Sequence, residues 1–304
     1  MRIGIFAGTT GSLSPLDVEM EASAAAAAGF DTYWLPQVFA WDAQTIIAAV
    51  GQRVPGIRFG TAVLPIYSRH PWALAQQALT IAALTNGRFT LGIGVSHRSI
   101  VEDMWGLSYE RPMQHVREYL DVLQPLLKGA SVDATGSTVS GRGRLEVPVT
   151  PCPLLVAALG PRMLEVAGSR ADGTITWMTG PSTLADLTVP VLCTAARKAG
   201  RPPPRIVVGV PVCVTGDPTT ARAYAARVYD AYGRLPAYRA MLDREELHGP
   251  ADLAVIGDES SVARQLSEFA AAGATELAAA EFGPTIDDRR RTRALLSGLA
   301  RKLA

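Results

Sequence analysis

Cysteine is scarce in this chain, and no cysteines have the spacing of a metal site or a redox motif. The 304 residues include four histidines and three cysteines, at positions 152, 193 and 213, with no CxxC pair. The sequence therefore predicts no metal site. A sparse and odd cysteine count is typical of a reducing compartment, so we expect a cytoplasmic protein with buried thiols.

A surplus of positive charge is also absent. Lysine and arginine number 29 and aspartate and glutamate 28, which gives a formal net charge of +1. Nucleic-acid binding requires basic side chains that neutralise phosphates, and an anionic membrane surface attracts polybasic segments. The charge balance therefore argues against both partners, and we expect the run Arg289–Arg291 to lie on a solvated helix face.

Long hydrophobic runs are missing as well. No apolar segment approaches the roughly 20 residues that span a bilayer. The first residues run directly into a Gly/Thr/Ser turn, so we interpret residues 2–6 as a strand rather than a signal peptide. Because 48% of the residues are hydrophobic, the chain can still bury a large core.

What the sequence does contain is a regular alternation of strand-like and helix-like segments. Such units build a parallel sheet, and eight of them can close into a barrel. We therefore predict a single α/β domain over residues 1–304, a (β/α)8 TIM barrel. The expected strands are 2–6, 32–35, 57–64, 89–94, 154–158, 174–177, 206–214 and 275–281.

Two segments depart from this alternation. Residues 131–150 are rich in Gly, Ser and Thr and predict a small hairpin insertion. Between the seventh and eighth strands, residues 218–232 and 236–247 predict a helical insertion, and we expect the segment 224–257 to cover the barrel mouth. The other expected helices are 15–28, 42–53, 70–85, 110–128, 161–171, 181–199, 260–272 and 287–303.

The active site of such a barrel lies at the carboxyl ends of its strands. Here the segments after strands two to six are rich in Gly, Pro and apolar residues and contain almost no carboxylates, which suits a broad, flat, apolar ligand. After the fifth strand, Gly160 turns the chain and Pro161 begins a helix. Free backbone N–H groups there predict an anion site to which Arg162 could add charge, although a plain, well-capped turn has the same pattern.

Among the histidines, His97 follows the fourth strand and could donate a proton or bind a ligand, unless backbone groups satisfy it. His70 precedes a proline, and we expect it to fix a helix start. His115 and His248 are expected to be structural or solvated. Three tryptophans could line a pocket or belong to the core: Trp41, Trp105 and Trp177.

Four segments, in order and at matching spacing, resemble the luciferase-like monooxygenases, and the resemblance extends from residue 1 to about residue 285. The fourth segment is similar to the phosphate-binding segment of members that use the deazaflavin coenzyme F420. The segments are GFDTYW at 29–34, GTAVLP at 60–65 with RHP at 69–71, GRFTLGIG at 87–94, and ALGPRML at 158–164 followed by ADG at 171–173.

The resemblance implies a barrel that holds a flavin-like ring at the carboxyl ends of its strands. It also implies a non-prolyl cis peptide after strand three, and the matching bond here joins Ala62 and Val63. The coenzyme contacts it implies are Ala62, Val63, Gly94, Val95, Ser96, His97, Ala158, Gly160, Pro161, Arg162, Trp177 and Met178.

The chain also departs from the pattern of this family. Gln37 and Val38 stand where its sugar-phosphate and alcohol dehydrogenases carry an Asp-His pair, and His97 replaces a glutamate. These departures favour a reductase, in which F420 gives hydride to an unidentified small organic substrate that His97 or Gln37 hydrogen-bonds. His97 could then donate the following proton.

Other functions stay open on the sequence alone. The Gly160-Pro161 turn could equally hold the phosphate of FMN in a luciferase-like monooxygenase. The missing Asp-His pair is also compatible with a barrel that binds the coenzyme without turnover, and a phosphate-ligand lyase or isomerase is a further alternative. The resemblance implies a homodimer.

Overall fold

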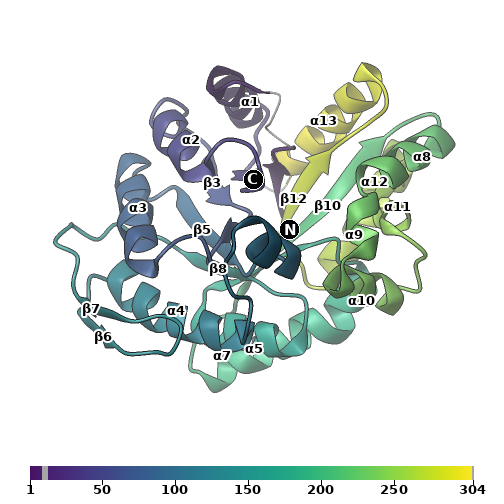
Figure 1. Ribbon diagram of the computed structural model, residues 1–304. Coiled ribbons are helices and arrows are strands. Elements are labelled where there is room, and N and C mark those ends of the chain that lie inside the picture. The colour runs from purple at the N-terminus through teal and green to yellow at the C-terminus, as the bar shows by residue number, and fades with distance from the viewer. Residues whose placement is uncertain (9–12, 303–304) are drawn as a thin grey trace.

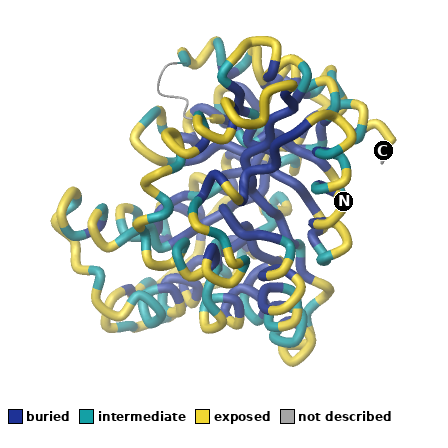
Figure 2. The backbone as a smooth tube through the Cα atoms, turned by 90° about the vertical axis from the view of Figure 1, so that its right-hand side faces the viewer, coloured by how far each residue is buried: buried dark blue, intermediate teal, exposed yellow. Residues whose placement is uncertain are grey.

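Eight parallel strands form a closed barrel in the computed structural model, which describes residues 1–8 and 13–302. Helices surround the strands, and the buried residues concentrate in the centre (Figures 1 and 2). This confirms the predicted TIM barrel. Each strand pairs with the next, and the last returns to the first: β1 (Arg2–Phe6), β2 (Thr32–Leu35), β3 (Arg58–Thr61), β5 (Phe89–Gly94), β8 (Leu154–Ala157), β9 (Gly173–Trp177), β10 (Arg205–Val214) and β12 (Glu276–Glu281).

Several of the surrounding helices begin where a side chain satisfies one of their first N–H groups. Ser14, Asp42, Asp258 and Thr285 each accept a hydrogen bond from a backbone N–H in the first turn. His70 does the same through Nδ1, which confirms its predicted role. The helices that surround the barrel are α1 (Pro15–Ala27), α2 (Ala43–Val50), α3 (Pro71–Leu84), α4 (Pro112–Leu127), α5 (Pro161–Arg170), α7 (Val189–Lys198), α12 (Glu259–Ala271) and α13 (Ile286–Arg301).

The middle of the barrel interior is filled by Trp34, which is fully buried. Its indole fits only because two neighbouring positions carry no side chain. A Cβ at Gly60 would lie 2.3 Å from the Trp34 ring, and one at Gly4 would lie 3.1 Å from its Nε1. Leu155, Ile175, Val207 and Ala278 complete this packed layer.

A buried ion cluster closes the amino end of the barrel. Glu276 is 2% exposed and accepts from Arg205 at 2.7 and 2.9 Å and from Arg2 at 2.5 Å. Arg205 also donates to the Thr90 hydroxyl at 3.0 Å. One bidentate guanidinium thereby connects β10, β12 and β5.

Two expected elements are interrupted. The predicted strand 57–64 ends at Thr61, and after the Ala62–Val63 bond it resumes as β4 (Leu64–Pro65), which pairs with the upper part of β5. The predicted helix 181–199 consists of α6 (Pro181–Thr183), a π-helical turn over Leu184–Thr188, and α7. Another π-helical turn, Ile100–Met104, follows β5 and was not predicted.

Both predicted insertions are present. Residues Val132–Ala134 and Gly141–Gly143 pair as the antiparallel strands β6 and β7. Between β10 and β12 lie α8 (Pro218–Val228), α9 (Asp230–Arg234), α10 (Pro236–Arg244) and α11 (Pro250–Leu253). An unpredicted strand, β11 (Val255–Gly257), follows them and pairs in parallel with the last three residues of β10. Among residues 1–8 and 13–302, no helix combines the length and the apolar character needed to cross a membrane.

The ion cluster at the amino end gives a stability prediction. Glu276→Gln leaves the partly buried Arg205 and the more exposed Arg2 without their counter-ion, so we expect the free energy of unfolding to fall by about 1.5–3 kcal/mol in urea titrations. The control is Asp133→Asn, which breaks the exposed Arg142–Asp133 pair and should change stability by less than about 1 kcal/mol. Equal, small effects of both substitutions would contradict the role given to Glu276.

Candidate active site

The carboxyl ends of the strands form a wall with few side chains beside an aromatic stack. Ala62, Val63 and Ala157 pack against the interior cluster but stay partly exposed, so solvent reaches this upper layer. Next to them the rings of Phe6 and Trp177 stack with centroids 4.9 Å apart and planes 25° from parallel. The layer therefore offers flat, mostly uncharged surfaces to a ligand.

The peptide bond between Ala62 and Val63 is cis, as the resemblance implied. It lies against glycines of β5: a Cβ at Gly94 would come within 2.8 Å of Val63 Cγ2, and one at Gly92 within 2.0 Å of the Thr61 carbonyl oxygen. The Thr61 hydroxyl donates to the Gly92 carbonyl and accepts from its N–H, both at 2.8 Å. The bulge thus requires glycine at both positions.

The start of α5 is open to a ligand. Gly160 is its N-cap, and no side chain in the described part of the chain caps this end. A Cβ added at Gly160 would meet nothing within 4 Å, and Pro161 and Arg162 are exposed. Pro161 has no N–H, and Met163 and Leu164 donate to the Gly160 carbonyl, so the backbone N–H of Arg162 remains at this end. Together with the dipole of the ten-residue helix and the Arg162 side chain it suits a phosphoryl group.

His97 lies at the end of β5, partly buried, with its ring 5.9 Å from that of Tyr238. Its backbone carbonyl accepts from Ile100 and Val101, whereas its ring forms no hydrogen bond within residues 1–8 and 13–302. Burial lowers the pKa of the imidazole below its ordinary value of 6.5. The ring is therefore neutral at pH 7 and free to bind a ligand. Ser96, just before it, has a left-handed backbone, φ 62°.

Two of the predicted site residues have structural tasks. The Gln37 side-chain oxygen accepts from the backbone N–H of Ala43 at 2.7 Å and so caps α2, which leaves only its NH₂ group for a ligand. Met178 is fully buried with φ 54°, so its side chain points into the core. Ala158 is also buried, beneath the α5 turn.

An aromatic cluster from the helical insertion extends the site beyond the predicted residues. Trp177 contacts the edges of Tyr229 and Tyr232, with centroids 6.1 and 5.8 Å away. Tyr232 in turn lies 5.1 Å from Tyr238, whose other neighbour is His97. The rings therefore link the end of β9 to the end of β5. The sequence predicted a covering segment here but did not single out these tyrosines, because nothing local distinguishes them from core aromatics.

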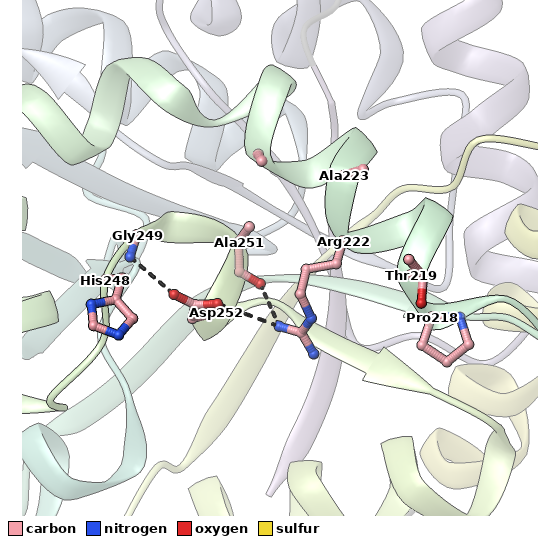
Figure 3. A pocket seen from close by; sticks show the side chains of 9 residues that line it. Pro218, Thr219, Arg222, Ala223, His248, Gly249, Ala251 and Asp252 are labelled. Carbon is pink, nitrogen blue, oxygen red and sulfur yellow. Dashed lines mark hydrogen bonds and ion pairs between the residues drawn. The ribbon is translucent and has the colours of Figure 1, made fainter.

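A separate surface groove of about 520 Å³ lies on the insertion, between α8 and the segment 248–252 (Figure 3). Arg222 crosses it, donating to the Ala251 carbonyl at 3.0 Å and lying 3.8 Å from Asp252. None of its lining residues belongs to a barrel strand. The groove is thus distinct from the strand ends.

Comparisons with known proteins give relatives of similar sequence and fold. A protein of Mycobacterium tuberculosis named as a putative coenzyme F420-dependent oxidoreductase is 31% identical over 188 residues, which cover 57% of this chain and 54% of that relative. The chain thus spans about half the length of this curated relative.

Solved structures share the fold over nearly the whole chain. The coenzyme F420-dependent tetrahydromethanopterin reductase of Methanopyrus kandleri superposes with a TM-score of 0.82 at 19% identity, over 97% of each chain. The oxygenating constituent of a diketocamphane monooxygenase of Pseudomonas putida, in complex with FMN, gives a TM-score of 0.78 at 18% identity, over 100% of this chain and 98% of the other. At these identities the likeness concerns the fold.

The model of the luciferase-like monooxygenase family matches residues 1–276, which include every barrel strand up to the first residue of β12 as well as the cis bulge and the open α5 turn. With its closed barrel and these two features, the chain belongs to the luciferase-like monooxygenase family.

Proposed function

We propose that the protein is a coenzyme F420-dependent oxidoreductase that reduces a small organic acceptor. One observation carries the proposal: the cis bulge at Ala62–Val63, packed on bare glycine backbone, shares the barrel rim with an uncapped helix start at Gly160. A flat ring suits the first feature and a phosphoryl tail suits the second. The similarity to the mycobacterial protein whose name gives F420 as its coenzyme supports the choice of coenzyme.

The residues present fit such a group. Gly94 lets the bulge at Val63 pack directly on β5, and the space around Gly160 is open. Ala62, Val63 and Gly94 would face the ring, Val95, Ser96 and His97 would hold its edge, and the first turn of α5 with Arg162 would bind the phosphate. When bound, F420 supplies the hydride.

The chain's own task is to orient the acceptor and exclude water. Trp177 and the tyrosines of the insertion present aromatic faces to the acceptor. His97, neutral at pH 7, can donate a hydrogen bond to a carbonyl oxygen or imine nitrogen through its ring N–H, and it can deliver a proton when protonated.

The reductive direction is favoured because the positions after β2 where dehydrogenases of the family carry an Asp-His pair hold no base. Gln37 has its oxygen committed to α2, and Val38 beside it is apolar. Glu281, at the end of β12, is 11% exposed and bound to Arg293 on α13. Among the described residues, these strand-end groups provide no free carboxylate that could take a proton from an alcohol.

An FMN-dependent monooxygenase is the second candidate, because the FMN-bound structure of the same fold uses a coenzyme whose phosphate the Gly160 corner could also take. The binding experiment below separates the two. The homodimer and the cytoplasmic location stay predictions.

Coenzyme titration tests the proposal directly. The purified protein should quench or shift F420 fluorescence at micromolar coenzyme, whereas FMN should bind at least about tenfold more weakly. Tight binding of FMN without binding of F420 would replace the first candidate by the second.

The bulge provides a matched pair of variants for the same titration. Gly94→Ala places a Cβ 2.8 Å from Val63 Cγ2 and 3.3 Å from the Ala157 Cβ, so we expect the F420 dissociation constant to rise about tenfold or more. Gly298→Ala, on α13 with nothing within 4 Å of the added Cβ, is the control and should leave the constant unchanged. Equal affinities for both variants would argue against the ring position.

The pH dependence of turnover tests His97. Because burial lowers the imidazole pKa, the acid form appears only as the pH falls below 6.5, and the folded protein loses stability in that same range. If the imidazolium delivers the proton, kcat should rise as the pH falls through the lowered pKa. His97→Gln should abolish this rise and lower kcat about 10- to 100-fold. A variant with an unaltered pH profile would remove His97 from proton delivery.

A further inference from the structure

A carboxylate joins the helical insertion to the loop that follows β9. Glu245, directly after α10, accepts from the backbone N–H of Thr183 at 2.5 Å and of Ser182 at 3.3 Å. It packs on bare backbone, since a Cβ at Gly180 would lie 2.3 Å from the Glu245 carboxyl carbon. The contact joins residues 62 and 63 positions apart, so it fixes tertiary structure rather than a local turn.

The segment that Glu245 holds is braced internally. Arg239, on α10, donates to the carbonyls of Leu247 and His248 and pairs with Asp243 at 2.8 Å. These bonds tie α10 to the turn after it. A carboxylate anchored at one end of this segment therefore positions the whole of it.

The same segment carries the tyrosines of the site. Tyr229 and Tyr232 contact Trp177, and Tyr238 lies between Tyr232 and His97. None of these groups carries a charge at pH 7: tryptophan and tyrosine side chains are neutral there, and burial lowers the pKa of His97, so its ring is neutral too. We call the cluster of contacting rings formed by Trp177, Tyr229, Tyr232, Tyr238 and His97 the aromatic slot.

We propose that Glu245 is a positioning residue that sets acceptor specificity: it holds the tyrosines over the barrel mouth, so the slot takes a planar, uncharged carbonyl or unsaturated compound. The reduction of that compound by F420 rests on the proposed function, whereas the binding of the compound does not. A planar ring gains aromatic contacts on several faces. An anionic group would lose its hydration among uncharged rings, and the two N–H groups that could replace it are already bound to Glu245.

Two matched probes test the substrate class on the full chain without coenzyme. 2-Acetylnaphthalene is planar and neutral, and 6-acetyl-2-naphthoate adds one carboxylate to the same ring. In isothermal titration calorimetry we expect the neutral probe to bind at least tenfold more tightly. Equal binding, or tighter binding of the carboxylate, overturns the substrate class.

Three variants test the positioning role of Glu245. Glu245→Ala leaves the N–H groups of Ser182 and Thr183 without their acceptor, so the neutral probe should bind at least tenfold more weakly. The Trp177 emission should also shift to the red; it is measured as the difference between proteins with and without the substitution Trp177→Phe. Glu245→Gln keeps an acceptor oxygen and should restore most of the affinity. Glu246→Gln, at the exposed neighbouring carboxylate, is the control and should match the unmodified protein.

Unchanged probe affinity and Trp177 emission in Glu245→Ala overturn the positioning role of Glu245. An equal loss of probe affinity in Glu246→Gln overturns it as well. Circular dichroism and a thermal unfolding curve check that the alanine variant is folded. If it is not, Tyr232→Leu takes its place, and unaltered probe binding in that variant overturns the aromatic slot as the binding site. A failure of the proposed function is distinguishable, since it removes F420 binding and hydride transfer and leaves the probe results in place.

Discussion

The site depends on a contact between two backbones, where the bulge after β3 lies against β5. Gly92 and Gly94 allow the approach, and the Thr61 hydroxyl fixes it with two hydrogen bonds to Gly92. Any side chain on these glycines would meet the Thr61 carbonyl or Val63. The contact divides the third strand into β3 and β4 and turns Ala62 and Val63 toward the barrel mouth. The absence of side chains, rather than their chemistry, thus shapes the surface that faces a ligand.

Two neighbouring helix starts at the rim are treated differently. The start of α5 has glycine at its N-cap and open space around it, whereas Glu245 from the insertion binds the N–H groups at the start of α6. Since both ends attract negative charge, the chain supplies its own anion at one and leaves the other for a ligand. The open start of α5 at Gly160 is therefore left for the phosphate of a coenzyme, and the start of α6 anchors the covering segment through Glu245. The aromatic slot lies between these two helix starts.

The regular parts of the fold could be predicted from the sequence. The bounds of β1, β2 and β5 agree with the expectation, because apolar runs between Gly- and Pro-rich turns define them. Periodicity gave no sign of the break at Ala62–Val63, since apolar residues continue through it; only the family resemblance indicated the cis bond. The hydrogen bond by which Gln37 caps α2 was not predicted, because Gln37 lies six residues before Ala43, outside the usual N-cap position. Glu245 and the tyrosines depend on contacts between distant segments, for which a single sequence carries no local signal.

The central claim is that the rim holds a flat coenzyme ring against the bulge with its phosphoryl tail at α5. A crystal structure of the protein soaked with F420 tests this most directly. The account predicts density for the ring in contact with Ala62 and Val63 and for the phosphate at the Arg162 N–H at the start of α5. Density for the coenzyme elsewhere, for instance in the groove crossed by Arg222, with the rim occupied only by the insertion's own side chains, would contradict it.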